Sequence, residues 1–433
     1  MGRNPAAAKA AKKPGARTLE GVNAMPAPTW GWLKISDTRV KVPELAVAGR
    51  DAVSVETDEP EVLMYDEHAF DRALEEASHR YEDRRRASAP GDAAHKAQLE
   101  AGEVGPLDVP ALSRYQEGAI CLEEDLTVEE AFQGGLGHEA GKYLREIAGE
   151  PVVIDVARGT SAAVTVRVDG EDGAAAAAAI DVVVGQNATL DLVIALDSPE
   201  GGQGLAGWSL NVAALEGARV GITCVQTLDD GYLSLDDTGL MIDERARVDV
   251  RHVVLGAGSS YTGLGGDLRG DDSKATISLS YLGAREQVRD FNYTLRHCGR
   301  RTECDIQANG VLAGRSKKTL RGTIDLVHGC KGSQGSERET VLLADERVDN
   351  KTVPVILCDE DDVMGNHGAT IGHVRPEQLL YLGCRGLSKE DAEALFLRAK
   401  LEDAALSAPD ERIRAGVVRL GNELVDDFEE GIL

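Results

Sequence analysis

Aromatic residues are scarce in this chain of 433 residues: they make up 4% of it, and tryptophan occurs three times. No apolar run approaches the roughly 18 residues that a membrane-spanning helix needs. The seven cysteines are scattered and form no Cys-x-x-Cys pair, which is typical of reduced thiols in a cytosolic protein and not of a disulfide framework. These absences together predict a cytoplasmic protein that does not enter a membrane.

Basic residues are also in short supply. The chain has 47 Lys and Arg against 74 Asp and Glu, which gives a formal net charge of −27. Sequence-independent binding to nucleic acid or to an anionic membrane surface depends on Lys and Arg, so we expect neither kind of partner. The start of the chain is basic but has no hydrophobic signal core, and we expect a flexible tail over 1–17.

Several motifs of enzymes and ion-binding proteins are missing. Without a GxxxxGK[ST] loop the chain is expected to bind no nucleotide by itself, and it lacks both the G-x-S-x-G elbow and the HExxH zinc motif. The stretch DEDDVMGNHGATIG at 359–372 fails as an EF-hand, because Val363 and Met364 stand where that loop needs an oxygen ligand and a glycine. Its four carboxylates are therefore expected in a solvated turn.

What the sequence does contain is a long series of short alternating strands. After residue 151 come runs such as VTVRV at 164–168, IDVVV at 180–184 and ATISLSYL at 275–282, punctuated by Gly, Asp and Asn. About a dozen such runs indicate an all-β sandwich, a barrel or a β-solenoid. No strict repeat period is visible, so the pattern alone favours the solenoid only slightly. The alanine run at 174–179 fits either a helical turn or a packing surface of small residues.

Helices are expected before this β region. An N-terminal helical region is predicted over 18–150, in which an apolar stripe from Phe70 to Ala77 has the i, i+3, i+4, i+7 spacing of an amphipathic helix. Trp30 and Trp32 stand close together in the same range, and we expect them to anchor a segment onto a core.

Helices are also expected after it. Ser-x-x-Asp capping boxes at 388–391 and 407–410 each begin an amphipathic stretch. The predicted order is therefore a β core over 151–375 followed by a C-terminal helical domain over 376–433.

Thiol and imidazole side chains gather loosely late in the chain. They are His297, Cys298, Cys304, His328, Cys330, Cys358, His367, His373 and Cys384. Thiolates and imidazoles are ligands for iron and for iron–sulfur clusters. Zinc-finger spacing is absent, however, and a single cysteine is equally a small buried hydrophobe. The spacing alone predicts no cluster.

One long stretch resembles a known family. TVPVILCDEDDVMGNHGATIGHVRPEQLLYLGCRGLSKEDAEALF at 352–396 combines P-x-I-x-C-D-E-D-D-V, HGAT, LLYL and RGLSKEDA. This combination is similar to the SufB/SufD family of iron–sulfur cluster assembly proteins, and the resemblance extends upstream to about residue 285.

The resemblance implies a mostly β protein with a right-handed parallel β-helix core, flanked by helical regions. It further implies a component without enzymatic activity of its own. In this family a SufB-like and a SufD-like chain pair through their β-helices, and each binds a SufC-type ABC ATPase through its C-terminal helices. A transient iron–sulfur cluster is assembled on the complex. A homodimer in place of the mixed pair remains open.

The resemblance is closer to SufD than to SufB. SufB-like members carry HEA where this chain has Gly368 after the histidine, and they have a scaffold cysteine near the position of Val348. His367 then matches the histidine that faces the SufB-like partner near the assembly site. SufD-like members often have a cysteine two residues earlier, where this chain has Gly365. Cys358 is the nearest thiol, as a substitute ligand beside His367 or as a core residue.

The helix predicted at 388–406 is the expected docking element for the ATPase, with Arg398 and Lys400 on its exposed face. Arg385 and Gly386 are expected to form the turn into it. Two other classes of function stay open. A carbohydrate-active β-helix enzyme needs paired carboxylates beside stacking aromatics on one solenoid face, and a purely structural solenoid adaptor needs no His367.

Overall fold

The computed structural model describes residues 16–26, 35–64, 70, 132–373, 376–425 and 428. The expected tail, Trp30 and Trp32 lie outside the described residues, apart from the end of the tail at 16–17. So does the stripe from Phe70 to Ala77, except for Phe70 itself, which is buried.

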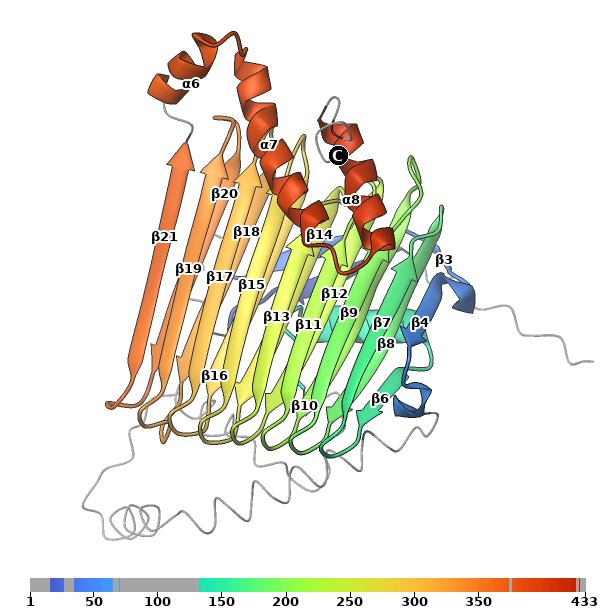
Figure 1. The fold of residues 1–433 in the computed structure, drawn as a ribbon, viewed down its shortest axis with the longest axis vertical. Coiled ribbons are helices and arrows are strands. Elements are labelled where there is room, and N and C mark those ends of the chain that lie inside the picture. Colours follow the sequence, from blue (N-terminus) through green and yellow to red (C-terminus); the bar gives the residue numbers. More distant parts are fainter. Residues whose placement is uncertain are drawn as a thin grey trace, which may run out of the picture.

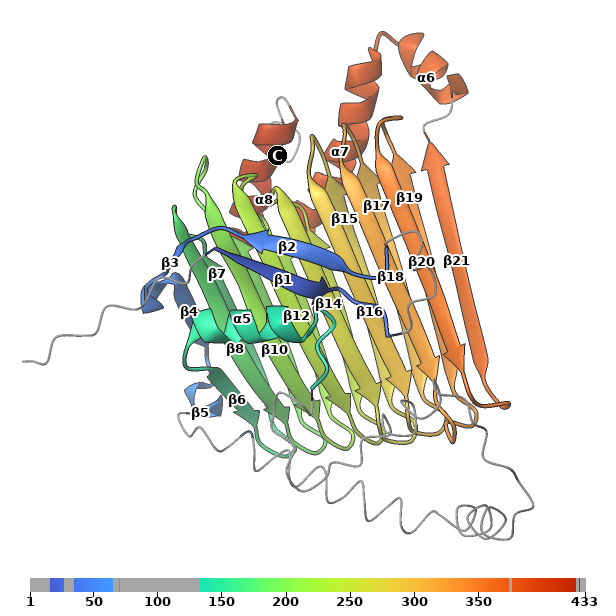
Figure 2. The same ribbon diagram turned by 180° about the vertical axis from the view of Figure 1, so that it is seen from behind.

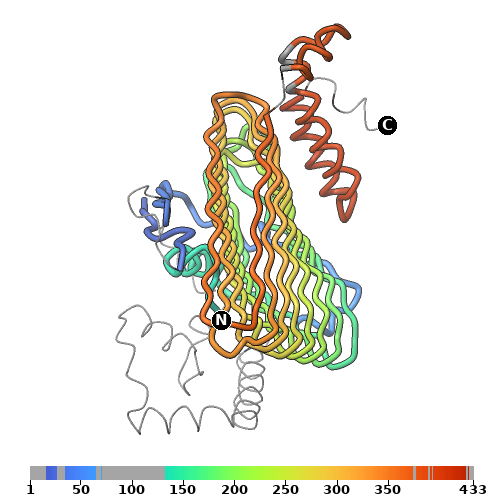
Figure 3. The backbone as a smooth tube through the Cα atoms, turned by 90° about the vertical axis from the view of Figure 1, so that its left-hand side faces the viewer, coloured from blue at the N-terminus to red at the C-terminus, as the bar shows by residue number. Residues whose placement is uncertain are grey.

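The core is a parallel β-solenoid, which confirms the predicted fold (Figures 1 and 3). After β6 and β7, each rung contributes one strand to a first sheet and the next strand to a second sheet. The first sheet contains β6 (Val152–Val156), β8 (Ala174–Val184), β10 (Gly204–Ala214), β12 (Tyr232–Ile242), β14 (Ser259–Leu268), β16 (Val288–His297), β18 (Lys317–Leu326) and β20 (Asp349–Cys358). The second contains β7 (Ser161–Asp169), β9 (Thr189–Asp197), β11 (Arg219–Gln226), β13 (Arg247–Val254), β15 (Lys274–Gly283), β17 (Glu303–Leu312), β19 (Gln334–Leu343) and β21 (Met364–His373).

Rung length varies, which explains why the sequence shows no strict period. Gly204 pairs with Ala174 on one side and with Tyr232 on the other, so the rung before Gly204 is longer than the rung after it. The rung from Lys317 to its register partner Asp349 is longer still. Since register is set by strand pairing and not by turn length, turns of different length are tolerated between strands.

The turns after the first-sheet strands share one backbone conformation and one hydrogen bond. In rung after rung a residue there takes a positive φ, and its amide donates to a carbonyl of the next rung at 2.6–2.9 Å. These residues are Asn187, Gly217, Arg245, Asp272, Arg301 and Gly332. The turns therefore form a hydrogen-bonded ladder of their own beside the two sheets.

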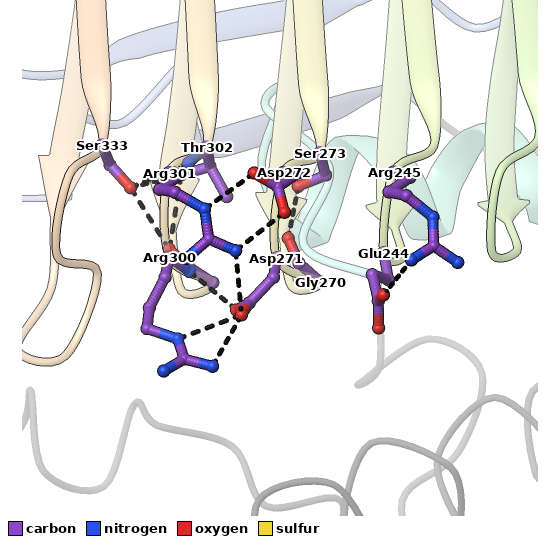
Figure 4. Close-up of polar contacts among 11 residues, drawn as sticks. Glu244, Arg245, Gly270, Asp271, Asp272, Ser273, Arg300, Arg301, Thr302 and Ser333 are labelled. Carbon is purple, nitrogen blue, oxygen red and sulfur yellow. Dashed lines mark hydrogen bonds and ion pairs between the residues drawn. The ribbon is translucent and has the colours of Figure 1, made fainter. Parts of the chain in front are cut away.

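Ion pairs run along the same row of turns (Figure 4). Arg300 Nε lies 3.0 Å from the Asp271 carboxylate, and Arg301 Nη2 lies 2.8 Å from that of Asp272. Arg245 reaches Glu244 in its own turn and Glu216 in the preceding one. Exposed pairs of this kind contribute little each, so we assign these ion pairs only a small share of the stability between rungs.

The alanine run is a strand, β8, and not a helical turn. Alanine is a strong helix former, but here both faces of the strand are buried. Ala176 and Ala178 face the solenoid core, whereas Ala175 and Ala177 pack under α5 (His138–Ala148). Only a small side chain fits on both sides, so tertiary packing overrides the local preference. The interpretation as a small-residue packing surface is confirmed.

The described part of 18–150 differs from the expected helical region. Apart from α5 it consists of short strands and 3₁₀ turns: β1 (Arg17–Val22), β2 (Thr38–Val42), β3 (Ala46–Val47), η2 (Arg50–Ala52), β4 (Val53–Thr57), η3 (Pro60–Val62) and β5 (Leu63–Met64). The prediction of helix is wrong for these segments because their backbone pairs in sheets: β1 and β2 pair with each other, and β3, β4 and β5 pair with strands of the solenoid.

The N-terminal segments lie over the outer face of the first sheet (Figure 2). Asn23 Nδ2 donates to Asp290 Oδ1 at 2.7 Å, and Thr38 Oγ1 donates to Oδ2 at 2.8 Å. Met25 packs on Val353 and Val355 of β20. The segment thus reaches from the first rungs to the last.

The last strand is followed by the helices α6 (Pro376–Gly383), α7 (Lys389–Leu406) and α8 (Glu411–Leu424). α8 and the later part of α7 lie over the outer face of the second sheet, whereas α6 lies beyond the ends of the strands (Figure 1). Leu401 of α7 and Val417 of α8 are buried against outward residues such as Val253. Ser388 and Asp391 form the predicted capping box. Within the described ranges, no helix combines the length and the apolar character needed to cross a membrane.

Candidate functional site

The last rung leaves the solenoid open at one end. β21 has one neighbouring strand in its sheet, β19, and β20 has one, β18. Nearly every residue of β21 is exposed. Ile371 lies next to the buried Val341, its register partner, and so belongs to a row of side chains that faces the solenoid core. Ile371 is nevertheless 51% exposed. We call β20, the turn after it and β21 the open end.

His367 lies on β21 in the row that faces the solenoid interior. A Cβ at Gly365 would lie 3.1 Å from Ile356 of the opposite sheet, so Gly365 faces inward. Residues two apart on a strand share a face, and His367 therefore points the same way. Its register partner on β19 is Glu337. The imidazole is exposed because no further rung covers it.

A buried charged network supports the open end from inside. Glu339 on β19 accepts hydrogen bonds from Lys318 Nζ at 2.6 Å, Tyr281 Oη at 2.8 Å and Thr352 Oγ1 at 2.5 Å. Lys318 is 1% exposed and Glu339 2%. Burial lowers the pKa of Lys318, while the nearby Glu339 carboxylate opposes that shift.

Glu337 is the second buried carboxylate of β19. Burial and the neighbouring Glu339 raise its pKa to about 7. Sequence reasoning missed Glu337, Glu339 and Lys318. The sequence signal for the two carboxylates was ERE at 337–339, within a strand. It indicates buried charge only once the pairing of that strand with its neighbours is known.

Cys358 is exposed and is not a core residue. It ends β20, and its Sγ contacts the backbone oxygen of Glu360 at 3.3 Å. His367 stands near the start of the next strand. In the described part of the chain no group of three or more His, Cys, Asp or Glu side chains is arranged to hold a metal ion. A ligand set larger than one or two groups therefore needs water or another chain.

The carboxylates of the opening motif lie in the turn between β20 and β21. Asp359, Asp361 and Asp362 are exposed, as expected of a solvated turn. Glu360 has a structural task, because it accepts hydrogen bonds from the amides of Gly329 at 2.9 Å and Asp361 at 3.1 Å. Burial opposes the effect of these amides, but together they hold the pKa of Glu360 below its usual value.

The other late thiols are mostly buried in the solenoid. His297 Nε2 contacts Cys304 Sγ at 3.1 Å, and its Nδ1 contacts Thr302 Oγ1 at 2.7 Å. Burial raises the pKa of Cys304 and of Cys298 to about 12 and that of Cys330 to about 11. Such thiols stay protonated at neutral pH and pack as small hydrophobes. Cys384, by contrast, is exposed just after α6.

The expected docking residues fall into two groups. Arg385 lies over the Tyr381 ring at 4.3 Å, and Gly386 takes a positive φ of 92°, so both belong to the turn between α6 and α7. Arg398 donates to the backbone oxygen of Phe428 at 3.3 Å, and Lys400 is half-buried. Arg398 and Lys400 therefore pack partly against the rest of the protein, whereas they were predicted on the exposed face of this helix.

Exposed apolar side chains stand out on α6 and the start of α7. Leu380 is 70% exposed and Tyr381 57%, and Leu387 and Leu395 are exposed as well. We call these four residues, which lie on α6, in the turn after it and on α7, the apolar patch of α6 and α7. A patch of this kind is a common feature of protein interaction sites.

Comparison with known proteins places these features in a family. The model for the SufBD core domain of SUF-system FeS cluster assembly matches residues 151–400. The iron–sulfur cluster assembly protein SufD of Bacillus subtilis is 31% identical over 152 residues, 35% of each chain. SufD of Escherichia coli is 24% identical over 188 residues, 43% of this chain and 44% of that protein.

A SufBD family protein of Mycobacterium tuberculosis is 29% identical over 142 residues, 33% of this chain and 17% of that protein. The chain thus spans less than half the length of each of these relatives. The family model nevertheless covers more than half of the 433 residues, from the first solenoid strand into α7. The chain belongs to the SufBD family of SUF-system iron–sulfur cluster assembly proteins and is SufD-like.

Proposed function

We propose that this chain is the SufD-like component of a cytoplasmic SUF scaffold complex and has no enzymatic activity of its own. In this proposal it pairs through its open end with a SufB-like chain, or with a second copy of itself, and it binds a SufC-type ABC ATPase through its C-terminal helices. Iron and sulfide are the substrates, and a transient iron–sulfur cluster is the product. The observation that carries the proposal is the bare last rung formed by β20 and β21.

The open end supports a partner because exposed edge strands are costly to leave uncovered. Their unpaired backbone groups invite pairing with another strand, and proteins normally blunt or cover them. Here the edge also exposes Ile371, which belongs to a core row. Adding one further rung from another chain satisfies the backbone groups and buries that side chain, as in recognition by strand addition.

The apolar patch of α6 and α7 supports a second partner. The chain has no P-loop of its own, so a nucleotide-driven step needs an ATPase from outside. Leu380 and Tyr381 offer that partner an apolar anchor of the kind that dominates interface energies. Arg385, stacked on Tyr381, adds a cation at the rim.

The helices also offer a route by which ATP hydrolysis affects the assembly site. α7 and α8 pack directly on strands of the second sheet, and β21 belongs to the same sheet. When an ATPase dimer closes on ATP, the two helical regions that it holds are drawn together. We propose that this motion shears the junction at the open end and exposes His367 and nearby groups to iron and sulfide.

Two alternatives remain distinguishable. A carbohydrate-active enzyme needs aromatic platforms beside paired carboxylates, but Trp208, the tryptophan among the described residues, is buried in β10. The buried carboxylates of β19 lie inside the solenoid and not on an outer face. A purely structural adaptor would lose nothing when His367 is replaced by alanine.

The decisive experiment is anaerobic purification of this chain from its native cells with a mild affinity tag. The proposal expects an ABC-type ATPase and a second β-solenoid chain, or a second copy of this chain, to co-elute. Truncation after residue 375 should remove the ATPase and leave the solenoid partner. His367→Ala should lower the iron and sulfide in the complex without dissociating it. Elution of the intact chain alone, as a monomer, contradicts the proposal.

A further inference from the structure

One buried carboxylate beneath the open end has an oxygen without a partner. Glu337 is 3% exposed, and its Oε2 atom makes no hydrogen bond within the described chain. Its neighbour Glu339 is saturated by three donors. Buried polar groups are normally hydrogen-bonded, and an unsatisfied one needs an explanation.

The opposite sheet is shaped to admit this carboxylate. Gly322 of β18 faces Glu337 across the interior, and a Cβ there would collide with both carboxylate oxygens. Glycine in a strand interior weakens the strand, and it often marks a close approach of another group. The glycine at this point of β18 thus provides the space in which Glu337 is seated.

The adjacent residue on the last strand is His367. It is the register partner of Glu337, and neighbouring strands lie about 4.8 Å apart. Both side chains belong to the inward row, since Gly335 and Gly365, two residues before each, both face inward. A carboxylate with a free oxygen and an exposed imidazole therefore stand side by side at the mouth of the solenoid.

These two groups suit a transition-metal ion. Imidazole and carboxylate are ligands for divalent iron, zinc and cobalt. The charge balance agrees, because Glu337 and Glu339 share one buried cation, Lys318, among the described residues around them. A divalent ion beside Glu337 would compensate the second carboxylate.

We propose that Glu337 and His367 form a two-ligand site for a divalent transition-metal ion at the open end, completed by water or by the chain that covers this end. Glu337 is the new element of this site. The inference rests on the proposed function, because it makes ferrous iron, a substrate of assembly, the ion bound in the cell.

The test is anaerobic titration of the full chain with Co²⁺, followed by its ligand-field absorption. Wild type should bind one Co²⁺ whose spectrum depends on both residues. Glu337→Gln and His367→Ala should each weaken this binding at least tenfold. Glu346→Gln, which removes an exposed carboxylate just beyond the end of β19, is the matched control and should bind as wild type does.

Gly322→Ala keeps both ligands and displaces the carboxylate, so it should weaken Co²⁺ binding as well. Thermal unfolding separates this effect from misfolding: Glu337→Gln should unfold at or above the wild-type temperature, because it removes an unpaired buried charge. Unchanged Co²⁺ binding by Glu337→Gln, or no binding by wild type, overturns the inference.

These outcomes are separate from those of the proposed function, because the titration needs no partner chain. If the partners co-purify but Co²⁺ binding does not depend on Glu337, the proposed metal site is ruled out and the scaffold role stands. If Co²⁺ binds as expected but no partner co-purifies, the scaffold role fails while the metal site stands.

Discussion

The two ends of the solenoid are built differently. At the first end, β4 pairs antiparallel with β7 and β5 pairs antiparallel with β6, so both sheets are continued by strands of opposite direction. At the other end, β20 and β21 have no such covering strand among the described residues. Parallel rungs stop where an antiparallel strand breaks the repeat. The chain therefore terminates its own solenoid at one end only, as far as the described residues show.

The same contrast appears in the interior. The first rungs are filled with Ala, Val, Ile and Leu, as in β8 and β9. The last rungs contain Lys318, Glu337 and Glu339 behind the bare edge. Apolar filling suits an end that only has to be stable, whereas buried charge is expensive and is usually kept where it serves a function.

The largest expected effect comes from breaking the buried pair behind the open end. Lys318→Met leaves Glu339 buried without its cation and should lower the free energy of unfolding by about 3–5 kcal/mol. The double variant Lys318→Met with Glu339→Gln should recover most of this loss, because the carboxylate that is bonded directly to Lys318 loses its charge together with the cation. Urea unfolding of the three proteins measures both values. Equal losses in the single and double variants would show that packing, and not charge, holds this end.

The next effect concerns the junction itself. Ile371→Asp should weaken pairing with the partner about 100-fold, because it places a charge in a row that pairing buries; this corresponds to about 2.7 kcal/mol. The unfolding temperature should stay unchanged, since the side chain is already exposed. Leu406→Asp is the control, as Leu406 is 77% exposed at the far end of α7. If the two variants bind the partner with equal affinity, the open end is not the pairing surface.

A third effect tests the middle of the solenoid, between the two ends. Asp236 is buried on β12, where it accepts hydrogen bonds from Ser234 and Thr262. Burial raises its pKa from 3.8 to about 7. The folded state thus holds this proton more tightly than the unfolded state does. Stability from this group is complete below about pH 4 and is lost as the pH rises towards 7.

Asp236→Asn should remove this loss of stability at rising pH. The free energy of unfolding of the variant should rise relative to that of wild type between pH 4 and 7, by on the order of 4 kcal/mol, with no further gain above that range. Unfolding free energies measured across this pH range provide the check. A constant difference between the two proteins at every pH would rule out titration of Asp236 as the cause.

The smallest effect belongs to the outer ladder of turns (Figure 4). Asp271→Asn removes a carboxylate that contacts Arg300 and Arg301 on the next rung. Exposed pairs are worth about 0.2–1 kcal/mol, so a loss within that range is expected, and it should shrink at high salt. A loss well above that range would mean that the turns carry more of the rung-to-rung stability than we assign to them.

The fold was largely predictable from the sequence, and the parts that were not have physical reasons. Alternation revealed the strands, and the capping box at Ser388 and Asp391 revealed α7. The box predicted at 407–410 is wrong, because Ser407 ends α7 and Asp410 is itself the N-cap of α8, where its side chain accepts a hydrogen bond from the Ile413 amide. The unequal lengths of the rungs hid the repeat, because strand register and not a fixed spacing aligns them. The strands before residue 65 were missed because each is short and gains its stability from a partner distant in sequence.

The site was predictable only in part. The family motif singled out His367, and the structure puts it on the last strand, in the inward row. Glu337 could not be recognised, because its importance depends on burial, on the glycine opposite and on the strand register that sets it beside His367. No local pattern encodes a pairing between residues a whole rung apart.

The covered end has a consequence for stoichiometry. A solenoid with two bare ends can add copies at both and grow into a filament, because a head-to-tail contact does not close. A solenoid with one bare end can join only one other solenoid in this way. Once two such ends meet, both are consumed, and the antiparallel strands β4 and β5 remain at the outer end of the pair. In the proposed complex, the antiparallel strands β4 and β5 would thereby limit the assembly to two solenoids.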